Sequence, residues 1–204
     1  MQMTCIERIE DLKEQLYQIL KKTLKPKRYL HVTGVIDTAI ALCDKYGIDR
    51  EKAELAALFH DYAKEWTKEE SLEFFEREAI SLTELELQSP QLWHARVAEK
   101  IAQEEYGIGD EDVLNAVRYH TTGRAGMSEL EILIALADYI EPSRSYPGVE
   151  GLRRAEEDLG MREALLQGLN HTIEYLLKEG QLIHPDTLEA RNDLLLSRKQ
   201  AEGK

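Results

Sequence analysis

Apolar residues recur at helical spacing along most of this chain, and no segment shows the strict alternation of a half-buried strand. A first apolar stripe covers Ile6–Thr23 and stops before Pro26, because the residue preceding a proline disfavours the helical conformation. A second covers about Arg28–Lys45 and is followed by Gly47, a residue typical of helix ends. Both segments are predicted to be amphipathic helices.

Capping residues mark most of the later helix starts. Asp49 can cap a helix from Arg50 to about Ala63, and three hydroxyl residues stand three positions before a glutamate, which is the capping-box spacing: Thr67, Thr83 and Ser128. The other predicted helices are Gln91–Tyr106 after Ser89-Pro90, the segment from Asp110 to His120, Ile132–Ile140, Met161–Lys178 and a last helix through Leu194–Leu196. Gly148 and Gly160 interrupt the pattern around Val149–Asp158.

Short loops and the lack of any internal repeat indicate one all-α domain of about eight to ten helices. We expect this single domain to cover residues 1–204. The helix at 6–23 should pack on a core of about 28–144, followed by C-terminal helices at 149–200.

Several ionisable residues stand on these apolar faces or at helix ends. The run Ala56–Lys64 is almost wholly apolar until it reaches the adjacent pair His60-Asp61, at a helix end where the dipole disfavours negative charge. The apolar stripes of three other predicted helices each carry one histidine, namely His31, His94 and His120. Any one of these residues has an ordinary explanation as a core histidine hydrogen-bonded to a backbone carbonyl.

Asp138 is the one carboxylate in Ile132–Ile140, a helix that is apolar nearly all round, so it is predicted to be buried. Because an unpaired buried carboxylate is costly, Asp138 should meet an arginine or a metal. Four histidines and two aspartates on separate helices of one small core are best satisfied if they converge on metal. Nitrogen and carboxylate ligands without cysteine suit iron, manganese, cobalt or zinc.

Composition limits the partners of this chain. Its 204 residues include 26 Lys and Arg against 39 Asp and Glu, a net charge of −13, so its surface should repel nucleic acids and anionic membranes. Its cysteines, Cys5 and Cys43, indicate neither a disulfide framework nor a cysteine zinc site, which fits a reducing cytosol. No apolar stretch approaches a membrane span in length, so we expect a cytoplasmic protein. An anionic substrate would need locally concentrated positive charge.

The order of His31, then His60-Asp61, then Asp138 resembles the H…HD…D signature of the HD-domain metal-dependent phosphohydrolases. Longer segments look like the YqeK family of bacterial symmetrical diadenosine tetraphosphate hydrolases: Arg28-Tyr-Leu-His31-Val-Thr-Gly-Val35, Leu58-Phe-His-Asp-Tyr-Ala-Lys64, Trp93-His94, Tyr119-His-Thr-Thr-Gly123, Ala137-Asp-Tyr-Ile-Glu-Pro142 with Arg144, and Leu182-Ile-His-Pro-Asp-Thr187 with Ala190-Arg-Asn192. The resemblance runs from about Arg28 to Asn192.

This resemblance implies hydrolysis of a dinucleoside tetraphosphate to two nucleoside diphosphates by metal-activated water. The metal ligands it implies are His31, His60, Asp61 and Asp138. The metal that the resemblance favours is iron, with cobalt, manganese or zinc as alternatives. The site would hold one or two such ions. The catalytic residues it implies are Asp61, Lys64, His94 and His120, and the nucleotide and phosphate contacts are Arg28, Asp61, Lys64, His94, His120, Thr121, Arg144, Ile183 and His184.

Several assignments stay open at this point. His94 and His120 could complete a second metal site that shares Asp61, or could contact phosphate and donate a proton to the leaving group. Arg124 is equally well explained as a surface residue, and His171 as a structural one. Two other functions fit the same residues: another HD enzyme, such as a nucleotidase or cyclic-nucleotide phosphodiesterase, and a non-catalytic nucleotide-binding sensor. Assembly as a homodimer is left open.

Overall fold

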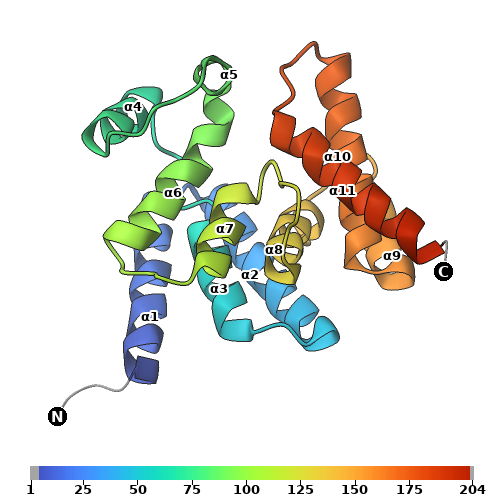
Figure 1. Cartoon of the computed structure of the whole chain (residues 1–204). Helices are drawn as coiled ribbons and strands as arrows, with labels where there is room; N and C mark the ends of the chain where they lie inside the picture. The colour runs from blue at the N-terminus through green and yellow to red at the C-terminus, as the bar shows by residue number, and fades with distance from the viewer. Residues whose placement is uncertain (1–4, 203–204) are drawn as a thin grey trace.

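The computed structural model describes residues 5–202, and within this range the chain forms eleven α helices, one short 3-10 helix and no strand (Figure 1). The all-α prediction is therefore confirmed. The helix number is one above the expected range, because the segment Val149–Leu159 is helical. Gly148 and Gly160 flank this helix and do not interrupt it. Residues 1–4 and 203–204 of the expected domain lie outside the described part.

The element order follows the predicted segments closely. In chain order the helices are α1 (Cys5–Thr23), α2 (Pro26–Tyr46), α3 (Arg50–Phe59), α4 (Lys68–Arg77), α5 (Glu84–Leu87), the 3-10 helix η1 (Pro90–Leu92), α6 (Trp93–Glu104), α7 (Glu111–Tyr119), α8 (Glu129–Ile140), α9 (Val149–Leu159), α10 (Met161–Lys178) and α11 (Pro185–Glu202).

Capping side chains fix most of these helix starts. Capping boxes open α4, α5 and α8, at Thr67, Thr83 and Ser128. The Asp49 and Asp110 carboxylates accept hydrogen bonds from the first amides of α3 and α7. The start near Ser89 differs from the prediction, because its side chain makes no capping hydrogen bond and Pro90 begins a 3-10 turn before α6.

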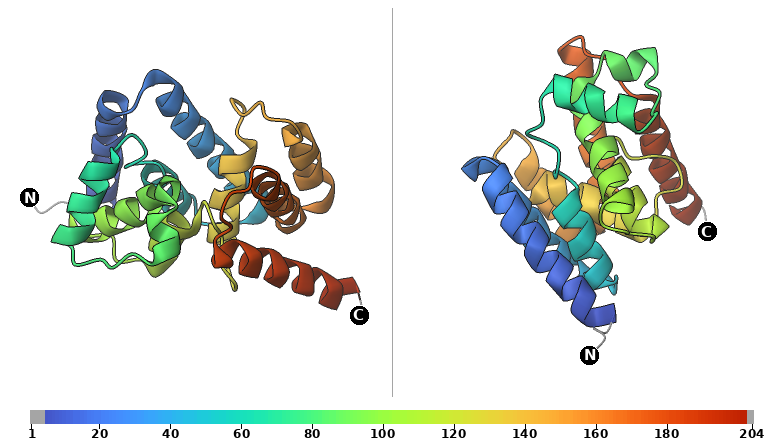
Figure 2. Two further views of the ribbon diagram at one scale, coloured as in Figure 1. Left: turned by 90° about the horizontal axis from the view of Figure 1, so that it is seen from above. Right: turned by 90° about the vertical axis from the view of Figure 1, so that its left-hand side faces the viewer.

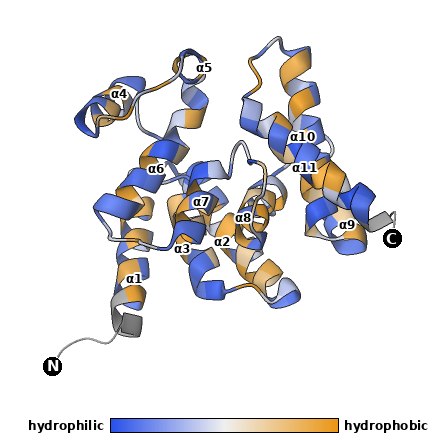
Figure 3. Cartoon of the chain, viewed as in Figure 1, coloured by the Kyte–Doolittle hydropathy of each residue, from blue (hydrophilic) through white to orange (hydrophobic). Residues whose placement is uncertain are grey.

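Helix α8 forms the centre of the molecule, because its residues are buried on nearly every side. It packs against α2, α3 and α7 on one side and against α9 and α10 on the other (Figures 1 and 2). The apolar residues of α2, α3 and α8 face this interior, and polar residues cover the outside (Figure 3). A smaller apolar cluster lies where α4 meets α6. In the described part of the chain, no helix combines the length and apolar character that a membrane crossing requires.

Candidate active site

Four histidines and two aspartates converge where α2, α3, α6, α7 and α8 meet. We call this set the histidine–aspartate cluster, and its members are His31 in α2, His60 and Asp61 directly after α3, His94 in the first turn of α6, His120 directly after α7, and Asp138 in the last turn of α8. The four imidazole rings form a series in the order His31, His60, His120 and His94, with ring centroids 5.1–5.6 Å apart. Residues separated by up to 107 positions in sequence are thus brought together.

Each histidine of the cluster is anchored through Nδ1. The anchoring oxygens lie 2.6 Å away for His60 (carbonyl of Ala57), 2.9 Å for His94 (carbonyl of Gln91), 2.7 Å for His120 (carbonyl of Val117) and 2.9 Å for His31 (carboxylate of Glu141). Because these oxygens can only accept, the hydrogen bonds assign the proton to Nδ1. Each Nε2 then keeps its lone pair for the centre of the cluster.

The Nε2 atoms face the two aspartates. The carboxylate of Asp61 lies 3.5 Å from Nε2 of His31, 3.6 Å from that of His60 and 3.3 Å from that of His94. Among the described residues, the buried Nε2 atoms of His31 and His60 make no hydrogen bond of good geometry, although Nε2 of His31 lies 3.0 Å from the carboxylate of Asp138. A buried imidazole nitrogen without a good hydrogen bond is costly unless something else binds it.

Two groups of ligand atoms in the cluster could each hold a metal ion. The first is His31, His60 and Asp138, and the second is Asp61, His94 and His120; in each group the atoms lie within 4.8 Å of one another. Both groups offer nitrogen and oxygen donors without sulfur, which suits a divalent transition metal. The buried Nε2 atoms of His31 and His60 in the first group, which make no hydrogen bond of good geometry, also indicate a bound metal ion. The residues of the cluster therefore fit a metal.

Three cationic side chains surround the cluster on its exposed side. Nη1 of Arg28 donates to the carboxylate of Asp61 at 2.7 Å, and Nζ of Lys64 lies 3.7 Å from the same group. Arg144 forms an ion pair with Asp138. The side chains of Arg28, Lys64 and Arg144 are 27%, 29% and 34% exposed, whereas those of His31, His60 and His94 are only 6%, 0% and 5% exposed. This cationic rim concentrates positive charge on a protein of net charge −13.

Asp138 is less buried than the sequence indicated. Its side chain is 22% exposed, and its cation is an arginine, because the guanidinium of Arg144 binds both its carboxylate and, through Nε at 2.8 Å, its carbonyl oxygen. The apolar periodicity of α8 places Asp138 correctly on the inner side. Helix α8 ends two residues later, at Ile140 as predicted, which opens this position to the rim.

Burial and charge shift the pKa values of the cluster. Burial lowers the pKa of His60, lowers that of His94 well below its ordinary value, and lowers that of His120 to about 4. Burial alone would raise the pKa of the Asp61 carboxyl, but nearby His60 and Lys64 lower it. These three histidines are therefore neutral near pH 7, as metal ligands must be, and Asp61 is ionised.

The remaining predicted residues lie at different distances from the cluster. Thr121 is close, with Oγ1 3.0 Å from Nε2 of His120. His184 lies in the α10–α11 connection, after the half-buried Ile183, and lines a small hollow of about 50 Å³ next to Trp93 and Tyr119. This hollow adjoins the residues that precede His94 and His120 in the chain, but it is separate from the cluster itself.

Two residues with open assignments lie away from the cluster. Arg124 makes a bidentate ion pair with the buried carboxylate of Glu131, in which Nη2 and Nε donate to Oε1 and Oε2 at 2.6 and 2.7 Å. His171 is exposed on α10, where its ring lies close to Gly148. Both residues are thus accounted for by contacts within the fold.

Glu141 is the buried residue that sequence reasoning missed. Its side chain is fully buried and accepts the hydrogen bond from Nδ1 of His31. The signal in the sequence was an acid between the apolar Ile140 and Pro142, at the end of a helix that already carried Asp138. Helical periodicity ends at this point, so it could not indicate where the side chain would turn.

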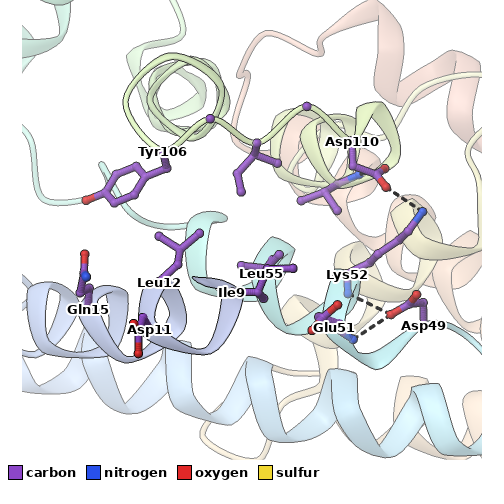
Figure 4. Close-up of a pocket in the computed structure, with 14 residues that line it drawn as sticks. Ile9, Asp11, Leu12, Gln15, Asp49, Glu51, Lys52, Leu55, Tyr106 and Asp110 are labelled. Atoms are coloured by element: carbon purple, nitrogen blue, oxygen red, sulfur yellow. Dashed lines mark hydrogen bonds and ion pairs between the residues drawn. The ribbon is translucent and has the colours of Figure 1, made fainter. Parts of the chain in front are cut away.

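A second, larger hollow lies between α1, α3 and the α6–α7 connection (Figure 4). It has a volume of about 690 Å³ and is lined by apolar side chains with acidic residues. Three of its polar side chains already serve the fold, because Lys52 pairs with Asp110 at 2.8 Å and Asp49 caps α3. None of the cluster residues lines it, and we assign it no function.

Comparison with known proteins identifies the family to which this chain belongs. A model of the HD domain family matches residues 28–143, so this chain belongs to the HD domain family. Two relatives named symmetrical bis(5'-nucleosyl)-tetraphosphatase confirm the resemblance seen in the sequence. The one from Bacillus subtilis is 45% identical over 90% of this chain and 97% of its own length. The one from Halalkalibacterium halodurans is 49% identical over 89% of this chain and 96% of its own length.

A solved structure agrees with this placement. The crystal structure of a predicted HD superfamily hydrolase involved in NAD metabolism from Clostridium acetobutylicum superimposes with a TM-score of 0.85. Its sequence is 40% identical, and the match covers 90% of this chain and 97% of that one.

Proposed function

We propose that this protein is a metal-dependent hydrolase that cleaves dinucleoside tetraphosphates symmetrically into two nucleoside diphosphates. The observation that carries the proposal is the cluster itself: histidines and aspartates turned toward one centre, with a cationic rim on the exposed side. Over about nine tenths of its length, the chain is 45% and 49% identical to two relatives that bear the name of this activity. These proteins match almost end to end, so the relatives offer no additional domain that could carry the function.

The proposed resident cofactor is a divalent transition metal, with iron preferred over cobalt, manganese or zinc. His31, His60, Asp61 and Asp138 would hold one ion, and the Nε2 atoms of the two histidines, which make no hydrogen bond of good geometry, support this assignment. When bound, such a metal lowers the pKa of water toward neutrality and polarises phosphoryl oxygens, which is the chemistry that cleavage of a phosphoanhydride needs. The hydrogen bonds at Nδ1 orient His31 and His60 for this site in advance.

The geometry favours one of the two roles left open for His94 and His120. Because burial lowers the pKa of both, with that of His120 at about 4, neither ring carries a proton to donate from Nε2 near pH 7. Their Nε2 atoms lie 3.2 Å apart beside the carboxylate of Asp61. We therefore propose that they serve as ligands of a second ion together with Asp61, and that they do not act as the general acid.

The cationic rim would bind the polyphosphate. Lys64 lies with Nζ 3.2 Å from Nε2 of His94, between the cluster and the exposed side, so it can reach phosphate oxygens next to the reacting centre. Arg28 and Arg144 now pair with Asp61 and Asp138, and both are free to turn to a phosphate once a metal satisfies these carboxylates. Thr121 can donate a hydroxyl hydrogen bond from the same side.

The wider setting is part of the same proposal. One HD domain over the whole chain would act in the cytoplasm on a small nucleotide, and nucleic acids and membranes would not be partners, because the protein carries a net charge of −13. The aromatic hollow next to His184 would lie near the nucleoside end of the substrate. A homodimer is compatible with this arrangement.

A substrate panel tests the proposal against other HD activities. The purified protein is assayed with and without cobaltous or ferrous ion on diadenosine tetraphosphate, AMP, cyclic AMP and NAD, the last because the Clostridium hydrolase is described as involved in NAD metabolism. We expect metal-dependent turnover of the tetraphosphate alone. Turnover of a monophosphate or cyclic nucleotide instead would identify another HD enzyme, and binding without turnover would identify a sensor.

A further inference from the structure

The four histidines of the cluster share one anchoring scheme, but His31 departs from it. His60, His94 and His120 donate from Nδ1 to a backbone carbonyl three residues earlier. The carbonyls of Ala57 and Val117 are available because His60 and His120 stand at the C-terminal ends of α3 and α7, where the regular hydrogen bonds stop, whereas the carbonyl of Gln91 belongs to the 3-10 turn that precedes α6. His31 stands inside α2, where the preceding carbonyls already accept helical hydrogen bonds. Its ring therefore needs an acceptor from another part of the chain.

Glu141 supplies this acceptor from a position that is fully buried. Its Oε1 atom lies 2.9 Å from Nδ1 of His31. Ser143 donates to the same carboxylate twice, from its backbone amide at 2.7 Å and from its hydroxyl at 2.5 Å. Pro142 turns the chain out of α8 at Glu141, whose φ and ψ of −52° and 151° are extended. The carboxylate is thus held in place before it meets the imidazole.

Gly34 leaves the space that this carboxylate occupies. It lies one turn after His31 in α2, and a Cβ atom there would stand 2.4 Å from Oε2 of Glu141. Glycine inside a helix destabilises it by about 1 kcal/mol relative to alanine. A glycine at this position is explained by the close approach of Glu141, which no other residue type would allow without displacement.

We propose that Glu141, admitted by Gly34, is a positioning residue that fixes the tautomer and ring orientation of His31 for metal binding. The inference rests on the proposed metal centre, and it adds a function for a residue that touches neither metal nor substrate. A carboxylate that accepts from one imidazole nitrogen directs the lone pair of the other nitrogen and strengthens it as a ligand. The Nε2 atom of His31, which makes no hydrogen bond of good geometry, is the atom so directed.

A purely structural role would give a different result. In that case the buried carboxylate would only tie α8 to α2, and its loss would lower the melting temperature with no specific effect on His31. The metal-free protein distinguishes these cases directly, because the ring nitrogen chemical shifts of ¹⁵N-labelled histidine report which nitrogen carries the proton. We expect His31 of the parent protein to be in the Nδ1–H form, and E141A and G34A to lose this preference.

Cobalt affinity of the folded variants is the second readout. Loss of such a partner typically weakens metal binding about 10–100-fold, so we expect E141A and G34A to bind cobalt at least roughly tenfold more weakly than the parent. E141Q keeps one acceptor oxygen, so its cobalt affinity should lie between those of the parent and E141A. If E141A does not fold, G34A and E141Q decide the question.

Two matched controls isolate the effect. Gly151 also lies in a helix, but a Cβ atom there meets nothing within 4 Å, so G151A should bind cobalt like the parent. Glu156 is another buried glutamate, and it is hydrogen-bonded to Tyr46 and Lys45 away from the cluster. The E156Q variant should therefore also bind cobalt with parental affinity. Folded G34A and E141A with parental cobalt affinity and a parental His31 tautomer would overturn the inference. A parent protein that binds no cobalt would instead reject the metal centre, while the tautomer experiment would still test the Glu141–His31 pair.

Discussion

At the scale of single residues, the two nitrogens of each clustered histidine have separate partners. Nδ1 is occupied by the fold, through a backbone carbonyl or through Glu141, and Nε2 faces the aspartates. This division sets the tautomer and the ring orientation together, which a metal site requires before the metal arrives. Burial also keeps His60, His94 and His120 neutral, because it lowers the pKa of each ring.

These neutral histidines should make the metal-free protein sensitive to acid. Their folded-state pKa values lie below the ordinary value of 6.5, with that of His120 at about 4, so between these limits the unfolded chain binds protons that the folded chain does not. The free energy of unfolding should therefore fall as the pH is lowered through this window. Thermal melting in chelator from about pH 7 to pH 5 checks this, and H120Q should melt with a shallower pH dependence than H171Q. A melting temperature that stays constant over the window would contradict the neutral assignment.

Lys64 offers a test of the cationic rim. Because its ammonium group would act on charge in the transition state and cannot itself coordinate a metal, Lys64→Ala should slow turnover of the dinucleotide by roughly a hundredfold or more. Metal content should stay at the parental level. Lys52→Ala is the matched control, since this lysine pairs with Asp110 far from the cluster and its loss should leave turnover unchanged. Normal turnover of the Lys64 variant at saturating substrate would show that Lys64 has a structural role and does not act on the transition state.

Sequence reasoning reached the clustered residues but not all of their partners. Helical periodicity identifies His31, His94 and Asp138, because an ionisable group on an apolar stripe must face the interior. Periodicity says nothing about residues beyond a helix end. For this reason the pairing of Arg144 with Asp138 and the turn of Glu141 toward His31 required the structure.

At the scale of secondary structure elements, most of the cluster stands at helix ends. His60 and His120 are the C-cap residues of α3 and α7, and Asp61 follows the first of them. Helix ends release carbonyl groups that can anchor a ring, and they let neighbouring side chains turn toward one point. The sequence predicted the end of α7 near His120, but it placed the end of α3 at about Ala63, whereas α3 ends at Phe59. The 3-10 turn at Pro90–Leu92 could not be predicted, because the sequence Ser89-Pro90 can precede an α helix or a 3-10 helix equally well.

Gly123 joins the segment after α7 to α11. Its φ is +64°, and a Cβ atom there would lie 2.7 Å from Cβ of Ala190 in α11. We expect Gly123→Ala to destabilise the protein through both backbone strain and displacement of α11. Gly126→Ala isolates the strain, since its φ is +68° but a Cβ there meets nothing within 4 Å.

Differential scanning calorimetry of the two glycine variants measures the difference. Strain at a positive φ alone costs on the order of 1 kcal/mol, so the Gly126 variant should lose about that much and the Gly123 variant clearly more. Equal losses would show that α11 moves aside freely. In that case the contact between Gly123 and Ala190 would not position α11.

At the scale of the whole molecule, the cluster connects five helices, α2, α3, α6, α7 and α8, that are distant in sequence. A ligand that binds only the folded state stabilises it by mass action, by about 2.7 kcal/mol at a hundred times its dissociation constant. Cobalt should therefore raise the melting temperature of the parent protein, and chelation should lower it. The Asp138→Ala variant should bind no ion, and cobalt should not raise its melting temperature. The Asp37→Ala variant, changed at an exposed position on α2, should bind the ion and show the parental rise in melting temperature. Full metal content in the Asp138 variant would contradict its assignment as a ligand.

The products formed from diadenosine tetraphosphate test the central claim most directly. The metal-loaded protein is incubated with this substrate, and the nucleotides are separated and counted. Symmetrical cleavage at a metal centre predicts two ADP for each molecule consumed, with neither ATP nor AMP, and no reaction after chelation. Equal amounts of ATP and AMP, turnover that is indifferent to chelation, or no turnover by the loaded protein would contradict the proposed function.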